Sequence, residues 1–267
     1  MRKIFIELLV SVALLLGTWL LLSQVDWMKL FKIEQTTKNT EEKVGDLFWD
    51  LLKKSETEIT TTSAVSAVDS MVTFICEKNQ IDRSPIKVHL LHKDEINAFA
   101  LPNHHLVVYS GLINACENQQ ELYGVLCHEI AHMEKNHVMN KLVKEVGLSM
   151  LISISTGNGN SEVIKNGLKQ LSSSAYDRKL ETEADLTAVD YLVKAGIDPQ
   201  PFANFLYRLG DETKNLPTQI YWISTHPESK ARAEAIIQEA LKHTDFKPVP
   251  TDSVQFISLK EKLHQGN

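Results

Sequence analysis

Residues 127–132 read CHEIAH, and the fold of the whole chain depends on how this stretch is interpreted. On a helix, His128 and His132 lie four residues apart on one face, so both imidazoles can reach one metal ion, with Glu129 beside them. An H-E-x-x-H string arises in roughly 3% of shuffled sequences with these His and Glu frequencies. The string therefore predicts a metal site only if the chain supplies a third ligand.

A third ligand close behind the string is the first solution to test. A catalytic zinc site uses three protein ligands and leaves one position open for water. Metzincins take a His ten residues after the first and a Gly at seven, but those positions hold Val138 and Lys135, which excludes that subclass. His137 misses the register by one residue, and we expect it on the exposed side of the helix or packed at its end.

The stretch DRKLETEAD, residues 177–185, offers an acidic ligand instead. Glu181 and Asp185 are four residues apart, hence on one helical face. Glu181 can bind zinc while Asp185 accepts the second ring N–H of a ligating His and so fixes its orientation. Glu183 projects to a different side, where we expect it to be solvated. The alternative is an acidic helix face without a metal.

The composition is that of a globular protein with room for one catalytic domain and an appendage. The chain has 267 residues, of which 43% are apolar and 23% charged. With 28 basic and 34 acidic residues, its net charge of −6 argues against a nucleic-acid partner. The chain has three cysteines, Cys76, Cys116 and Cys127, so they cannot all pair in disulfides, and none has the C-x-x-C spacing of a metal or redox site. We expect them to be small buried side chains.

The N-terminal residues 1–24 form a predicted transmembrane anchor. The apolar run from Ile4 to Leu22 is long enough to cross a bilayer, and it lacks the small-residue cleavage site of a signal peptide. The basic residues Arg2 and Lys3 favour a cytoplasmic N-terminus, although three later lysines partly offset them. We therefore expect a single uncleaved span with the catalytic domain outside the cytoplasm, in a periplasm-like space.

The rest of the chain divides into three predicted parts: a helical linker at 25–63, a catalytic domain at 64–243 and a tail at 244–267. Within the domain, the patterns predict one strand and one hairpin, at 86–91 and 96–113. They also predict a helix of about six turns beginning after the N-cap Asn118. Further helices are expected at 64–79, 180–195, 199–206 and 227–240. For 147–175 we prefer a helix–loop–helix connection to a lid over the cleft.

Four ordered segments carry a family resemblance: NAFALP at 97–102, HEIAH at 128–132, RKLETEAD at 178–185 and THPESKAR at 225–232. Together they resemble the HtpX/BepA-like zinc metallopeptidases, a group that includes Ste-type CAAX prenyl proteases and Oma-type peptidases. The resemblance covers about residues 64–243. It implies an α+β fold: a mostly helical, zincin-like (gluzincin) domain with a small antiparallel sheet or hairpin, after one transmembrane helix.

The resemblance also implies roles for individual residues. One Zn²⁺ per chain would be held by His128, His132 and Glu181. Glu129 becomes the catalytic carboxylate, and Asp185 becomes the partner of a ligating His.

Two arginines and a further histidine also match the family pattern. Arg178 is the basic residue three before the ligand, and Arg232 follows the His-Pro pair that begins at His226. His226 is a candidate to donate to the oxyanion of the tetrahedral intermediate, or to cap the zinc in a resting state. Alternatively, His226 helps to start the last helix and Arg232 pairs with an internal carboxylate.

The hairpin that contains Asn97, Ala98 and Phe99 resembles the family's edge strand, along which an extended peptide can add main-chain hydrogen bonds. The departure from the family is at residues 103–105, Asn-His-His, where relatives usually have Gly-Gly before the His. Asn tolerates positive φ and His does so less often, so the turn is expected to be reshaped. We interpret this His pair as exposed loop residues, since no acidic or Cys partner is near in sequence.

The resemblance implies a membrane-anchored zinc endopeptidase that cleaves unfolded or misassembled cell-envelope proteins in quality control. The alternative is a non-catalytic, zinc-containing chaperone or adaptor that binds extended segments. The intact Glu129 favours the enzyme. A prenyl-peptide protease would need several membrane spans, and the sequence predicts one.

Overall fold

The computed structural model describes most of the chain from residue 33 onward. The described residues are 33–159, 161–173, 175–212, 225–227, 229–243, 246–248 and 253–265. The chain divides into two units, residues 1–40 and 41–267; apart from the first residues of α3, the features below belong to the second. The predicted anchor, residues 1–24, lies outside the described residues. None of the helices within the described ranges is long and apolar enough to cross a bilayer.

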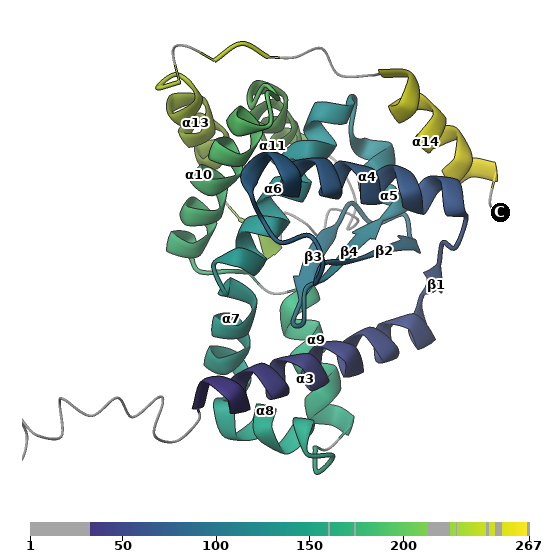
Figure 1. The fold of residues 1–267 in the computed structure, drawn as a ribbon, viewed down its shortest axis with the longest axis vertical. Helices are drawn as coiled ribbons and strands as arrows, with labels where there is room; N and C mark the ends of the chain where they lie inside the picture. Colours follow the sequence, from purple (N-terminus) through teal and green to yellow (C-terminus); the bar gives the residue numbers. More distant parts are fainter. Residues whose placement is uncertain are drawn as a thin grey trace, which may run out of the picture. The chain divides into compact units, whose positions relative to one another are not determined.

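A four-stranded sheet with the order β1-β2-β4-β3 lies at the centre of the second unit (Figure 1). The strands are β1 (Thr57–Glu58), β2 (Lys87–His92), β3 (Ala98–Leu101) and β4 (His105–Tyr109). The two outer pairs are antiparallel, whereas β2 and β4 are parallel. The expected antiparallel hairpin is confirmed as β3 and β4, but the sheet as a whole is mixed, so the expectation of an antiparallel sheet is wrong. The cause is the path of the hairpin, because β4 returns into the space between β2 and β3.

The turn of this hairpin adopts the conformation that its sequence disfavours. Asn103 has φ 60° and His104 has φ 56°, so two non-glycine residues lie in the left-handed region. The carbonyl of His104 then accepts a hydrogen bond from the backbone N–H of Lys87, at 2.9 Å, which ties the turn to β2. The turn is thus built without glycine.

Helix α6 (Gln119–Glu134) is buried along almost its whole length, and it carries the CHEIAH stretch. Its N-cap is as predicted, since the side chain of Asn118 accepts the N–H of Glu121 at 3.0 Å. The carboxylate of Glu121 accepts the N–H of Glu117 at 2.8 Å. Gly124 permits close packing, because a Cβ there would lie 2.3 Å from the side chain of Phe202 in α11 (Gln200–Glu212).

The long helix predicted after Asn118 is in fact two helices. Helix α6 ends at Glu134, and α7 begins at His137 and runs to Val146. Asn136 lies between them with φ 56°, a left-handed conformation that turns the chain. Residues after the break therefore do not continue the faces of α6.

The remaining helices are α3 (Ile33–Ser55), α4 (Thr62–Asn79), α5 (Ser110–Ala115), α8 (Leu148–Ser155), α9 (Ser161–Ser173), α10 (Arg178–Lys194), α13 (Ser229–Ala240) and α14 (Ser253–Gln265). Helix α13 packs against both α10 and α11, and so does α6. The expected helix–loop–helix connection is confirmed as α8 and α9.

The predicted tail contains α14, which packs on α4 through the buried side chains of Phe256, Leu259 and Leu263. All three cysteines are free and buried, as expected.

A chain of polar side chains links α3 to the sheet. Nε2 of His89 lies 2.9 Å from Nδ1 of His105, and Nε2 of His105 lies 2.9 Å from a carboxylate oxygen of Asp46. Trp49 stacks on His89 with 3.6 Å between ring centroids. The side chain of His105 is 3% exposed, so the expectation of an exposed His104-His105 pair without an acidic partner is wrong for His105.

The buried His89 predicts acid sensitivity. Burial, followed by the charges of His105 and Lys87, lowers the pKa of His89 to about 3, so the folded chain keeps the ring neutral. An unfolded chain protonates it below pH ~6.5, and stability is therefore lost as the pH falls from there towards the folded pKa.

We expect His89→Gln to flatten the fall in unfolding free energy between pH 6 and 4 by about 1.4 kcal/mol per pH unit. Glutamine keeps a hydrogen-bonding group facing His105 but does not titrate. Urea unfolding of the 267-residue chain at several pH values measures the slope. His92→Gln, at the exposed end of β2, is the matched control. An unchanged slope in His89→Gln would contradict the assignment.

Gly124 predicts a second effect, on packing. Gly124→Ala gains up to about 1 kcal/mol of helix propensity. It also forces a methyl group against Phe202, and such overpacking costs about 1 to 3 kcal/mol. We therefore expect net destabilisation in urea unfolding. Glu134→Ala, at an exposed position of the same helix, should be nearly neutral. A stabilised Gly124→Ala chain would show that α6 and α11 are less closely packed.

Candidate metal centre

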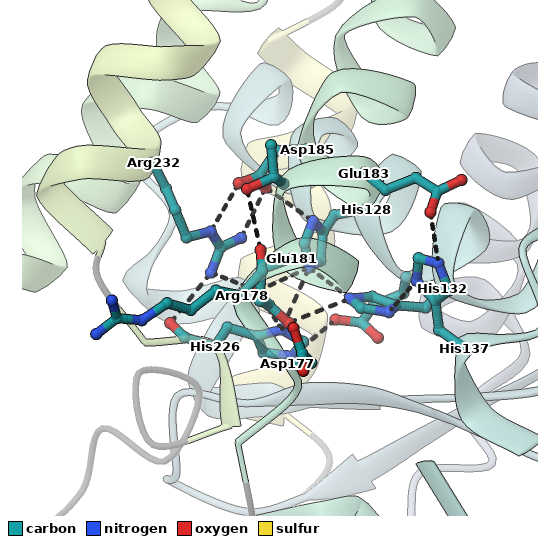
Figure 2. A network of polar contacts seen from close by, with 12 residues as sticks. His128, His132, His137, Asp177, Arg178, Glu181, Glu183, Asp185, His226 and Arg232 are labelled. Atoms are coloured by element: carbon teal, nitrogen blue, oxygen red, sulfur yellow. Dashed lines mark hydrogen bonds and ion pairs between the residues drawn. The ribbon is translucent and has the colours of Figure 1, made fainter. Parts of the chain in front are cut away.

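Four side chains converge in the interior between α6, α10 and the short segment before α13 (Figure 2). They are His128, His132, Glu181 and His226, each at most 2% exposed, and one donor atom of each lies within 4.8 Å of all the others. Nε2 of His128 lies 3.0 Å from Nε2 of His132 and 3.2 Å from Nδ1 of His226. The carboxylate of Glu181 lies 3.5 Å from Nε2 of His132 and 3.0 Å from Nδ1 of His226.

Local sequence positions each of these groups. The i, i+4 spacing places both histidines of α6 on one side of that helix. Asp177 caps α10 by accepting the N–H of Lys179 at 3.0 Å, which puts Glu181 in the first helical turn. The backbone N–H of Tyr176 donates to the carbonyl of Thr225 at 3.0 Å and so holds His226 beside the start of α10.

Behind the cluster, Asp185 and Arg232 form a buried ion pair. Nε and a terminal nitrogen of Arg232 each lie 2.7 Å from one oxygen of Asp185. Nδ1 of His128 lies 3.0 Å from the same carboxylate. Another nitrogen of Arg232 lies 2.8 Å from Glu181. Asp185 therefore faces the ring nitrogen of His128 that points away from the cluster.

The charges of these carboxylates are set by burial and by Arg232. Burial acts to raise the pKa of Asp185, but Arg232 outweighs it and the pKa falls to about 2. Burial likewise opposes ionisation of Glu181, whose pKa is nevertheless held well below its usual range by His226 and Arg232. Both carboxylates are thus charged at neutral pH.

The histidines, in contrast, are neutral. Burial lowers the pKa of His128 to about 4, of His132 to about 3 and of His226 to about 4. Neutral imidazole and carboxylate are the protonation states that bind a metal. Ring nitrogens facing each other at 3.0 to 3.2 Å, together with a carboxylate, form the nitrogen and oxygen donor set that suits zinc. The residues present therefore fit a zinc ion.

The other predicted site residues lie at different distances from this cluster. Glu129 is buried, and its Oε1 lies 3.4 Å from Nε2 of His226. Arg178 is exposed in the first turn of α10. The guanidinium that contacts both Glu181 and Asp185 is that of Arg232.

Strand β3 is the terminal strand of the sheet, and it packs against both α6 and α9. Asn97, just before the strand, and Ala98 and Phe99 within it are all buried. The side-chain N–H of Asn97 donates to the carbonyl of Ser172 in α9, at 3.4 Å. The end of α9 therefore lies beside the start of β3.

Of the two positions expected for His137, the structure shows packing at the end of α6, not exposure. His137 is 2% exposed, and its Nδ1 lies 3.0 Å from Nδ1 of His132. In one continuous helix, a residue five positions on would be turned away by roughly 140°. The break at Asn136 brings it back. Glu183, expected to be solvated, is half exposed and lies 3.4 Å from Nε2 of His137.

Sequence reasoning missed two residues beside the cluster. The ring of Tyr176 lies 4.2 Å from that of His132, and the ammonium of Lys141 lies 3.9 Å from the Tyr176 centroid. Burial lowers the pKa of Lys141 to about 8. Both residues line a hollow of about 250 Å³ between α7 and the start of α10. No local sequence pattern indicated either residue.

Residues 64–240, more than half of the chain, match the sequence profile of peptidase family M48. The chain belongs to peptidase family M48. It is 29% identical over 185 residues to the beta-barrel assembly-enhancing protease of Yersinia pestis, covering 65% of this chain and 37% of that relative. It is 30% identical over 197 residues to the mitochondrial metalloendopeptidase OMA1 of Bos taurus, covering 66% of this chain and 38% of that one.

A third relative, the beta-barrel assembly-enhancing protease of Escherichia coli K12, is 25% identical over 207 residues, covering 72% of this chain and 42% of the relative. The chain thus spans about two fifths of the length of these relatives. The family resemblance of the four sequence segments is confirmed.

The buried ion pair predicts that Arg232 is structurally essential. Arg232→Met leaves the buried carboxylates of Asp185 and Glu181 without their cation, which should cost about 3 to 5 kcal/mol of unfolding free energy. Adding Asp185→Asn removes one of the uncompensated charges and should recover at least about 1 kcal/mol. Urea unfolding of the metal-free chain measures both.

The matched control is Lys179→Met, on the exposed side of α10. It should change stability by less than about 0.5 kcal/mol. Equal losses in Lys179→Met and Arg232→Met would refute the assignment of Arg232.

Proposed function

We propose that this chain is a zinc-dependent metalloendopeptidase that cleaves unfolded or misassembled proteins. One observation carries the proposal: a buried cluster of three histidines and a glutamate, with Glu129 beside it, in a chain of family M48. His128, His132 and Glu181 would hold the ion, since a catalytic site needs three protein ligands. The named activity of the relatives, proteolysis, supports the same conclusion.

Held by His128, His132 and Glu181, a zinc ion would supply Lewis-acid chemistry: it would lower the pKa of a water toward 7 and polarise the scissile carbonyl. Glu129 takes the proton of the attacking water and delivers it to the leaving amine. Its carboxylate lies 3.4 Å from Nε2 of His226, so the two side chains that would act on the reacting bond are adjacent. Asp185 and Arg232 keep His128 oriented during this exchange.

His226 has two proposed roles that belong to different conformations. In the arrangement described, its Nδ1 belongs to the donor cluster, which gives the site a fourth protein donor. A fourth donor occupies the position that a water or substrate needs, so this arrangement is a resting one. When substrate displaces the ring, a ring N–H can donate to the developing oxyanion.

For the substrate, we propose an extended polypeptide that pairs with β3. The strand is terminal in the sheet and packs on the helix that carries Glu129, so a peptide added there would lie beside the cluster. The buried Asn97 and its contact with α9 require that α9 shift before such pairing. A membrane anchor at residues 1–24, an extracytoplasmic domain and a role in envelope quality control complete this proposal.

A second candidate function is a non-catalytic chaperone or adaptor. The four-donor arrangement of the cluster favours it, because a zinc ion with four protein ligands is typical of structural sites. Under this proposal, β3 would capture extended clients and Glu129 would have no proton to transfer.

Casein hydrolysis by the full chain, with bound zinc quantified in parallel, tests the enzyme. Glu129→Gln should keep zinc but lose at least about 100-fold in rate, since the proton acceptor is gone. Glu181→Ala should lose zinc and activity together. Glu134→Gln, exposed on the same helix, is the control and should match the parent chain in both readouts.

The result that would reject the enzyme is tight zinc binding by the parent chain without hydrolysis, persisting when His226 is replaced by Ala. That replacement removes the fourth donor and also the proposed oxyanion donor, so a site that was only closed should then hydrolyse casein slowly but faster than Glu129→Gln. Inactivity equal to that of Glu129→Gln would favour the chaperone or adaptor function.

A further inference from the structure

Beyond the cluster, His132 contacts a second imidazole. Nε2 of His132 faces His128 and Glu181, whereas its Nδ1 lies 3.0 Å from Nδ1 of His137 (Figure 2). The far nitrogen of His137, Nε2, lies 3.4 Å from a carboxylate oxygen of Glu183. The result is a linear series of hydrogen-bonding groups that leads from the cluster to the surface.

The positions of these nitrogens allow only two proton arrangements. Two nitrogens in contact share one proton, so either His132 or His137 donates from Nδ1. If His137 donates, neutral His132 must carry its own proton on Nε2, pointing into the cluster. If His132 donates, its Nε2 has a free lone pair directed at the other donors. Only the second arrangement leaves Nε2 of His132 able to bind a metal.

Glu183 selects between these arrangements. A carboxylate accepts hydrogen bonds and donates none, so it favours a proton on Nε2 of His137. A neutral His137 with its proton there has an acceptor at Nδ1, and His132 must then be the donor. Glu183 also forms an ion pair with Lys135, whose ammonium lies 3.8 Å from the other carboxylate oxygen.

The two ligating histidines of α6 therefore have different outer partners. His128 faces Asp185, which is 2% exposed and held by two bonds from Arg232. His132 faces an imidazole, and the carboxylate behind that imidazole is 50% exposed. The His132 side of the cluster thus depends on a partner brought in by the break between α6 and α7.

We propose that His137, supported by Glu183, is a positioning residue for the metal centre: it accepts the Nδ1 proton of His132 and so directs the Nε2 lone pair of His132 at the ion. This inference rests on the proposed zinc site. It assigns to His137 no contact with the ion or with substrate.

The test uses the full chain and zinc itself, with affinity measured by chelator competition. His137→Asn and His137→Leu are nearly equal in size, but only Asn offers an oxygen that can accept the Nδ1 proton of His132. We expect His137→Leu to bind zinc about 10- to 100-fold more weakly than the parent chain, the usual loss for such partners. His137→Asn should stay within about 5-fold of it.

Two further readouts separate positioning from a purely structural role. Cobalt(II) bound in place of zinc should show altered visible absorption bands in His137→Leu but parent-like bands in His137→Asn, because the orientation of His132 differs. Glu183→Ala should weaken zinc binding about 2- to 5-fold, since Glu183 acts through His137 and is half exposed. Glu134→Ala is the matched exposed carboxylate and should have no effect on either readout.

Equal zinc affinities in His137→Asn and His137→Leu would overturn the inference, whether both were weak or both were normal, because the acceptor would then not matter. That result, with zinc bound tightly by the parent chain, leaves the proposed enzyme intact. A parent chain that binds no zinc would overturn both.

Discussion

The paired hydrogen bonds between Arg232 and Asp185 join three helices that are far apart in the sequence. The arginine comes from α13, the aspartate from α10, and the imidazole of His128 that meets the same carboxylate comes from α6. Burying these charges is costly unless the geometry is close and each group is paired. The three helices must therefore dock in register before the charges are compensated, and the same docking brings the four donors of the cluster together.

The sequence predicted what helical periodicity controls. His128 with His132, and Glu181 with Asp185, follow from the i, i+4 spacing because the backbone geometry of a helix is fixed. The start of α6 was also predictable, because the N-cap Asn118 and the N–H group that it accepts, of Glu121, are only three residues apart in the sequence. Family segments in a fixed order then indicated that the two helices meet, which periodicity alone does not predict.

What the sequence did not predict depends on contacts between distant segments. The parallel pairing of β2 and β4 follows from where the hairpin inserts, which no local pattern encodes. The acidic partner of His105 is Asp46, 59 residues earlier in the chain. The apolar positions of α14 have helical spacing, but they needed the surface of α4 to bury them. The mixed sheet, the buried His105 and the last helix therefore became visible only in the folded chain.

The left-handed residue Asn136 has a consequence for how variation in this chain should be read. It contacts no donor of the cluster, yet its backbone angle decides whether His137 faces His132. Glycine can replace it without strain, whereas a β-branched residue cannot adopt that angle cheaply. A natural variant at this position could impair the metal centre while every residue of the recognised motifs remained intact, and a motif search would classify that chain as normal.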